Sequence, residues 1–114
     1  MPSNSKQSQP ERQPPVKAIR RADGVVEYHV LCAEGWDDCE SLARFIVKQF
    51  SAATLSQSDA IWVRRWDLAV GSVRFSLRHH EDIGNWFASD GSTPEGEALM
   101  RRIADALNER LTEK

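Results

Sequence analysis

The spacing of apolar residues along the chain separates helical segments from strands. From residue 39 to residue 50, apolar side chains recur every three or four positions, which predicts one buried face of a helix of about 14 residues. Asp37 is the expected N-cap, with Glu40 three positions later, and Trp36 stands where a hydrophobic staple packs against the first turn. The apolar face consists of Cys39, Leu42, Ala43, Ile46 and Phe50.

A second helix is predicted near the C-terminal end of the sequence. Thr93 is its expected N-cap and Pro94 its first residue, because proline favours the first helical position. Glu95 and Glu97 suit the positive end of the helix dipole. The apolar stripe that follows consists of Leu99, Ile103, Leu107 and Leu111.

Between the helices the apolar spacing changes to alternation, which is typical of strands with one buried side. Two strands are expected on either side of a turn at Val70 and Gly71. Residues 24–32 form another alternating segment, residues 85–88 a short last strand, and residues 51–59 a polar loop. The expected turn sets three cross-strand pairs, Leu68 with Val73, Trp66 with Phe75 and Asp67 with Arg74.

These elements follow one another in the order β-α-β-β-β-α, and each has one apolar side. The economical arrangement is an α+β fold: a two-layer sandwich whose mainly antiparallel sheet has about four strands, with both helices on one face. The bulky rings of the strands, which include three of the four tryptophans, are expected beneath the helices.

Residues 1–22 differ in composition from the remainder of the 114-residue chain. They hold four of the five prolines, many serines and glutamines, and a net charge of +4, which leaves −6 for residues 23–114. We expect a disordered tail there and a single domain over residues 23–114. The basic tail is interpreted either as a solvated leader or as a segment that adheres to nucleic acid or an acidic partner.

No segment indicates a membrane or secretory role. Residues 1–22 lack the apolar core of a secretory signal, and no apolar run approaches the ~20 residues that span a bilayer. Cys32 and Cys39 are separated by six residues, which fits neither a redox pair nor half of a zinc site. Both are expected to be buried free thiols in a reducing cytoplasm.

In a two-layer fold one face of the sheet stays uncovered, and it is a candidate interaction surface. Ile61 and Val63 at its edge suggest a contact with another protein or a second copy of this one, while a solvated surface explains them equally well. Without stacking aromatics and with charges of both signs, this face argues against nucleic acid. Its other expected residues are Glu27, His29, Arg65, Asp67, Arg74, Arg78 and His80.

Acidic residues also gather around Trp36 at the start of the first helix, namely Glu34, Asp37, Asp38 and Glu40. One interpretation is a negative patch that meets a basic partner, as toxin-neutralising proteins do. The plainer interpretation, which we favour, is that these acids complement the helix dipole and that Trp36 packs as a staple.

Candidate chemistry is sparse. His79 and His80 are adjacent in a strand and point to opposite faces, so they cannot both reach one metal ion without a bulge. A polar cluster at the strand end is favoured over a metal-dependent enzyme centred on these histidines with Glu81 and Asp82. Nucleophile motifs and glycine-rich phosphate loops are missing from the sequence. We therefore predict no catalytic residue, no metal site, no cofactor and no enzymatic activity.

The tryptophan strands and the turns between them occur together in a known sequence pattern. It combines a tryptophan-bearing strand and glycine turn at residues 66–71, an alternating strand, an acidic turn at residues 81–82 and a second tryptophan strand at residues 85–87. The Trp36-Asp37 pair also fits. Over residues 25–110 the chain resembles a family of small bacterial proteins that is classed as a domain of unknown function. The resemblance implies a cytoplasmic bacterial protein and transfers no activity or site residues.

The sequence therefore favours a soluble, non-enzymatic domain that binds another protein or itself. The predicted contact residues are Ile61, Val63, Arg65, Arg74, Arg78 and His80, together with Trp36, Asp37 and Asp38. The alternatives are an accessory protein that binds nucleic acid through the basic tail and the arginine-bearing face, and a toxin-neutralising protein of the immunity type.

Overall fold

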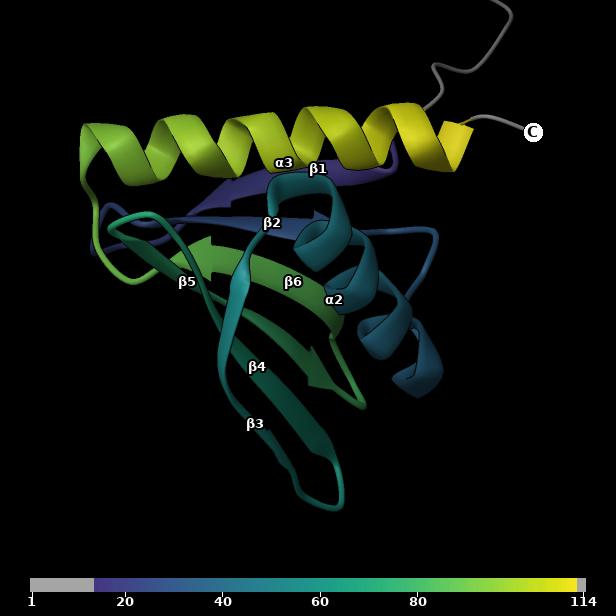
Figure 1. The fold of residues 1–114 in the computed structure, drawn as a ribbon. Helices are drawn as coiled ribbons and strands as arrows, with labels where there is room; N and C mark the ends of the chain where they lie inside the picture. The colour runs from purple at the N-terminus through teal and green to yellow at the C-terminus, as the bar shows by residue number, and fades with distance from the viewer. Residues whose placement is uncertain (1–13, 113–114) are drawn as a thin grey trace, which may run out of the picture.

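The computed structural model describes residues 14–112, which form two helices and one six-stranded antiparallel sheet (Figure 1). Along the sheet the strands follow the order β1-β2-β6-β5-β4-β3. In chain order the elements are β1 (Val16–Arg20), β2 (Val26–Val30), α2 (Trp36–Phe50), β3 (Ala53–Asp59), β4 (Val63–Val70), β5 (Val73–His80), β6 (Gly84–Ser89) and α3 (Pro94–Thr112).

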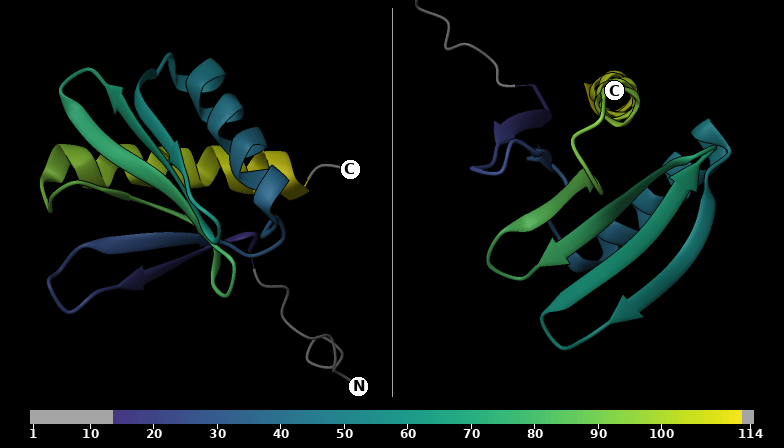
Figure 2. Two further views of the ribbon diagram at one scale, coloured as in Figure 1. Left: turned by 90° about the horizontal axis from the view of Figure 1, so that it is seen from below. Right: turned by 90° about the vertical axis from the view of Figure 1, so that its left-hand side faces the viewer.

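Both helices bury their apolar stripes in the same core on one face of the sheet, as predicted. Helix α2 lies over β4, β5 and β6, and α3 crosses β1, β2, β5 and β6. The sheet is twisted, so that the β1–β2 hairpin and the β3–β4 hairpin run in different directions (Figure 2). The α+β class is confirmed, but the described part of the chain contributes six strands to the sheet and not four.

The two strands that the apolar pattern does not predict, β1 and β3, are the two edges of the sheet. Strand β3 replaces the expected polar loop, and every one of its residues is exposed. Strand β1 lies within the segment predicted as a tail, so the sheet begins at Val16; residues 1–13 of that segment lie outside the described residues. In β1 only Val16 is buried. Edge strands of this kind have no alternating apolar pattern, because little of them packs against the core.

The turn between β4 and β5 lies one residue later than predicted. Val70 pairs with Val73, so the turn consists of Gly71 and Ser72, and Gly71 takes the positive φ of 61° that such a turn requires. The predicted pairs are therefore wrong, although the same side chains face the core. The observed pairs are Leu68 with Phe75, Trp66 with Leu77, Asp67 with Ser76 and Ala69 with Arg74.

The N-cap of α3 is the residue predicted from the sequence, whereas the N-cap of α2 is not. Thr93 caps α3, since its Oγ1 accepts a hydrogen bond from the Gly96 N–H at 3.0 Å. In α2 the N-cap is Gly35 and not Asp37, and the Asp38 side chain accepts the Gly35 N–H at 3.0 Å. Trp36 and Asp37 thus belong to the first turn of the helix.

The tryptophans do not all lie beneath the helices, which corrects a central expectation. Only Trp66 is in the core. Trp86 faces the uncovered side of the sheet because Phe87, the next residue, takes the buried position and stacks on Tyr28 with ring centroids 5.2 Å apart. Cys32 was also expected to be buried and is exposed, while Cys39 is buried.

Candidate functional site

Two hairpin turns place exposed apolar side chains at one end of the sheet. The β3–β4 turn carries Ile61, Trp62 and Val63, which are 79%, 59% and 38% exposed, and the β5–β6 turn carries Ile83, which is 52% exposed. The turns lie side by side, because the Glu81 N–H donates a hydrogen bond to the Trp62 carbonyl oxygen at 3.0 Å. We call these four residues the tip surface.

Four exposed carboxylates lie at the same end of the molecule as the tip surface. Glu81 and Asp82 are exposed in the β5–β6 turn itself. Glu34 and Asp37 are exposed at the N-terminal end of α2, which reaches the same end of the molecule (Figure 1). Glu34 lies over Gly84, where a Cβ in place of the glycine hydrogen would come within 3.2 Å of the Glu34 Cγ. The tip surface is therefore apolar with an acidic rim.

A buried polar network beneath the start of α2 holds this end of the molecule together. The Asn85 side-chain amide donates hydrogen bonds to the Ala33 and Gly35 carbonyl oxygens at 2.7 and 3.0 Å. Its Oδ1 accepts a hydrogen bond from His79 Nδ1 at 3.0 Å. Asn85 and His79 are 1% and 3% exposed, so strand β6 fixes the loop before α2 through bonds shielded from water.

Arg64 completes the network from strand β4. Its guanidinium donates hydrogen bonds to Asp59 at 3.1 and 3.3 Å and to the Trp36 carbonyl oxygen at 3.1 Å. The guanidinium carbon also lies 4.7 Å from the centre of the Trp36 ring, and His79 contacts the same ring edge-on. Trp36 is thus held by side chains on the sheet. It is the first residue of α2 and follows the Gly35 N-cap, so its predicted place as a staple before the N-cap is wrong.

The uncovered sheet face carries a cavity of about 350 Å³ with arginines around it. Arg65 and Arg78 lie directly opposite each other on β4 and β5, and Trp86 lies opposite Arg78 on β6. Arg21, from the β1–β2 turn, lines the other side. Small buried side chains, Ser76 and Ala88, also line it. We call this site the arginine cavity.

The arginines differ in their partners. Arg21 pairs with Asp23 at 2.6 Å, and Arg65 pairs with Asp67 at 2.9 Å. Arg78 forms no ion pair with the described residues, and its Nε donates a hydrogen bond to Ser76 Oγ at 3.1 Å. Burial, followed by the positive charge of Arg65, lowers the pKa of the Arg78 guanidinium from its usual value.

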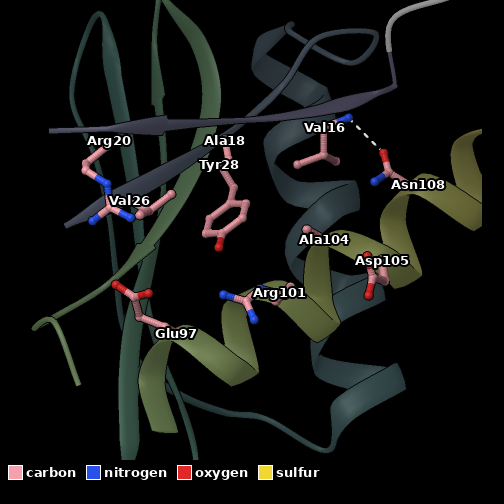
Figure 3. Close-up of a pocket in the computed structure, with 10 residues that line it drawn as sticks. All are labelled: Val16, Ala18, Arg20, Val26, Tyr28, Glu97, Arg101, Ala104, Asp105 and Asn108. Atoms are coloured by element: carbon pink, nitrogen blue, oxygen red, sulfur yellow. Dashed lines mark hydrogen bonds between the residues drawn. The ribbon is translucent and has the colours of Figure 1, made fainter. Parts of the chain in front are cut away.

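A second hollow, of about 460 Å³, is an open groove between α3 and the β1–β2 hairpin (Figure 3). The Tyr28 and Arg101 side chains point into it (Figure 3). Its lining mixes two arginines, Arg20 and Arg101, with two acids, Glu97 and Asp105, so neither sign of charge predominates. The described residues of this groove do not form a nucleophile–base pair.

The predicted contact residues fall in different places. Ile61 and Val63 belong to the tip surface, and Arg65 and Arg78 to the arginine cavity. Arg74 is exposed farther along β5, opposite Ala69 and outside that cavity. His80 is opposite Val63 on the outer face, and its Nδ1 accepts the Asp82 N–H at 3.0 Å.

The acidic residues of the prediction also separate. Asp38 is occupied in capping α2, whereas Asp37 is exposed in the first turn of that helix. His79 and His80 point to opposite faces of β5, as predicted. Within residues 14–112 no group of three or more histidine, cysteine or acidic side chains is placed to hold a metal ion.

Four site residues were missed from the sequence: Trp62, Ile83, Trp86 and Arg21. The sequence does carry a signal for two of them, Trp62 and Trp86. Ile61, Trp62 and Val63 are consecutive, so they cannot all face the core from one strand. Trp86 and Phe87 are also consecutive, and one of the two rings has to face outward. Arg21 gives no such signal, because its position depends on how β1 and β2 join the sheet.

Comparisons with protein-family models, with curated protein sequences and with solved structures found no significant match to this chain. Of the helices in residues 14–112, neither combines the length and the apolar character that a membrane span requires.

Proposed function

We propose that this chain is a non-enzymatic interaction domain that binds a partner protein through the tip surface. The observation that supports the proposal is the gathering of Ile61, Trp62, Val63 and Ile83, all exposed, on two turns that are hydrogen-bonded to each other. Exposed apolar clusters ringed by polar groups are typical of protein contacts, and tryptophan is prominent among the residues that dominate binding energy.

The acidic rim indicates the chemistry of the partner. Glu34, Asp37, Glu81 and Asp82 form no ion pair with the described residues, so their charges are available to a partner. A partner with an apolar centre and a rim of lysine or arginine matches this surface. A second copy of this chain does not, because a two-fold contact would bring equal acidic rims together.

The toxin-neutralising role considered from the sequence is a narrower form of the same proposal. It requires an acidic surface that covers a basic partner, and the tip surface with its rim has this character.

The test is a binding measurement on matched variants. Affinity capture from a bacterial lysate, followed by purification of the captured protein, gives a defined partner. Trp62→Ser is expected to weaken binding of that partner at least about tenfold, because it removes the largest apolar side chain of the tip surface. Leu55→Ser is the control, since Leu55 is also exposed, at 47%, but lies on β3 away from the tip. It should change the affinity less than about twofold.

Charge reversal separates this proposal from self-association. Glu81→Lys should slow association with a basic partner and reduce the dependence of binding on salt. The proposal is wrong if Trp62→Ser and Leu55→Ser weaken binding equally. It is also wrong if light scattering shows a dimer that Trp62→Ser dissociates, because the tip surface would then be a contact between copies.

A further inference from the structure

We propose that the arginine cavity on the uncovered sheet face binds a small ligand through a phosphate group. Arg65 and Arg78 would hold the phosphate oxygens, and Trp86 would contact the remainder of the ligand. This site is on the outer face of the sheet and uses none of the four residues of the tip surface, so the two proposals can fail independently.

Three arginine side chains converge at this cavity. Arg65 and Arg78 are direct cross-strand neighbours, an arrangement of like charges that costs stability. Arg21 reaches the same cavity from the β1–β2 turn. Asp23 and Asp90 also line the cavity, and Asp67 and Glu27 pair with Arg65 and Arg21. Among the described residues, Arg78 is the arginine of the cavity that has no carboxylate partner. A bound dianion would relieve the repulsion between the guanidinium groups.

Arg78 is the centre of the site. Arg21 and Arg65 are each bonded to a neighbouring carboxylate, whereas Arg78 has only the neutral Ser76 hydroxyl among the described residues. A guanidinium has five N–H donors, of which Arg78 uses one in this hydrogen bond. The other donors are therefore available to the planar, forked contacts that arginine makes with phosphate oxygens.

Ser76 adds a neutral donor to the site. It is 4% exposed, and its hydroxyl oxygen accepts the hydrogen bond from Arg78. The hydroxyl proton is consequently free to be donated to a ligand oxygen. Ala88, opposite Ser76 on β6, is equally small and leaves the space above the sheet open.

Trp86 and the size of the cavity narrow the ligand class. The indole stacks on His29 with ring centroids 5.7 Å apart, and His29 Nε2 donates to Glu27 at 2.9 Å, so the ring is held in place. About 350 Å³ is at the small end of ligand pockets. A phosphorylated molecule of the size of a nucleoside monophosphate fits this combination of arginines and an aromatic wall.

The experiment uses the full chain, with inorganic phosphate, adenosine monophosphate and acetate as probes, followed by calorimetry and by amide NMR shifts. Phosphate and adenosine monophosphate should shift the amides of Ser76, Arg78 and Trp86, with the nucleotide bound more tightly. Arg78→Gln should weaken both at least about tenfold. Arg74→Gln is the matched control, because Arg74 lies on the same strand and face but outside the cavity. It should change affinity by less than about twofold.

Several outcomes would overturn the proposal: no binding of phosphate at millimolar concentration, equal weakening by the two arginine variants, or acetate bound as tightly as phosphate. Binding of a single-stranded oligonucleotide without binding of the mononucleotide would also overturn it and would indicate a nucleic-acid surface instead. If Arg78→Gln does not fold, Arg65→Gln replaces it and should show the same loss. Trp62→Ser should leave phosphate binding unchanged.

Discussion

Arg64 shows how one side chain can be buried with its charge. Its side chain is only 6% exposed, yet the guanidinium donates hydrogen bonds to Asp59 and to the Trp36 carbonyl oxygen and lies over the Trp36 ring. The hydrogen bond with Asp59 raises the pKa of Arg64, against the opposite effect of burial. A buried cation of this kind adds little net stability but fixes its neighbours, because loss of any partner leaves a charge without compensation. It thereby holds Trp36 and the start of α2 against the sheet.

Among the polar residues, Asn85 is expected to be the one whose substitution destabilises the fold most. Asn85→Ala removes three hydrogen bonds, one buried and two part-buried, and leaves the Ala33 and Gly35 carbonyl groups without their donor. We expect a loss of about 3 kcal/mol in the free energy of unfolding, measured by urea denaturation. Asn108→Ala, which removes a single bond to the Val16 N–H, is the control and should cost about 1 kcal/mol. Equal losses would contradict the role given to the network.

The two thiols should differ in reactivity. Burial raises the pKa of the Cys39 thiol to about 11, so it stays protonated at neutral pH, whereas Cys32 is exposed. Alkylation of the folded protein at pH 8 should therefore modify Cys32 alone, as mass spectrometry can show. The Cys32→Ser variant should resist alkylation until it is unfolded in urea. Rapid labelling of Cys39 in the folded protein would contradict the structure.

Single residues were predictable where a periodic pattern fixes which side they face. Phe75, Leu77 and Leu68 were assigned to the core on alternation alone, and they are buried. Trp86 was misplaced because it and Phe87 are both large and apolar, so the pattern does not say which of them faces inward. Arg64 is inward by the same alternation, but a charged residue gives no sign of being buried until its partners, Asp59 and Trp36, are known.

At the scale of elements, helix α3 depends on its first turn. Thr93→Ala removes the side-chain acceptor of the Gly96 N–H and should lower the free energy of unfolding by about 1 kcal/mol. Ser92→Ala is a close control, since Ser92 is exposed and lies one residue before the cap. Its effect in the same thermal or urea denaturation should be within about 0.5 kcal/mol. A larger effect at Ser92 than at Thr93 would mean that the helix begins earlier.

The β3–β4 hairpin should contribute a pH-dependent stability. Burial disfavours the ionised form of Asp67, but hydrogen bonds from Ser56 at 2.6 Å and Arg65 at 2.9 Å outweigh it, so the pKa of Asp67 is below its usual value. A lowered pKa stabilises the fold above the unfolded pKa, about 3.9, and this contribution is lost as the pH falls through the folded pKa.

Asp67→Asn tests this contribution. The difference in free energy of unfolding between the native chain and this variant should be constant from pH 5 to pH 7. It should shrink as the pH is lowered towards pH 3, which urea denaturation at each pH can show. A difference that stays the same down to pH 3 would contradict the lowered pKa.

The helices and central strands were predictable as elements, and the edges were not. Strands β4, β5 and β6 have a buried side and therefore a periodic signal. Strand β3 is exposed throughout and is held by backbone pairing with β4, to which it adds no apolar pattern. The Gly71-Ser72 turn was misplaced by one residue because the spacing of the flanking apolar residues permits either register.

At the scale of the whole molecule, the pairing of β2 with β6 joins segments that are far apart in the sequence. We call this pairing the seam. Strand β2 precedes α2, which carries the chain across the sheet to β3, and the chain then returns strand by strand to β6 beside β2. Sequence spacing alone does not reveal this closure, because β2 and β6 are separated by most of the domain. The arginine cavity depends on it, since Arg21 comes from one side of the seam and Arg78 from the other.

The seam should be the first part of the sheet to open. Only three residue pairs join β2 to β6, whereas eight join β4 to β5. Amides of β1 and β2 should therefore exchange with deuterium faster than those of β4 and β5, in native conditions and at one pH. Residues of α3 that face β5 serve as an internal reference for global unfolding. Slower exchange in β1 than in β5 would contradict this order.

This short seam has a consequence for any molecule that occupies the space between Arg21 and Arg78. Such an occupant would touch both halves of the sheet, and by thermodynamic linkage its binding free energy would be added to the cost of separating them. Saturation with the occupant should then slow deuterium uptake in β1 and β2 selectively. Conversely, a substitution that destabilises the β1–β2 hairpin, such as one at Val30, should weaken binding of this molecule, although Val30 does not line the cavity.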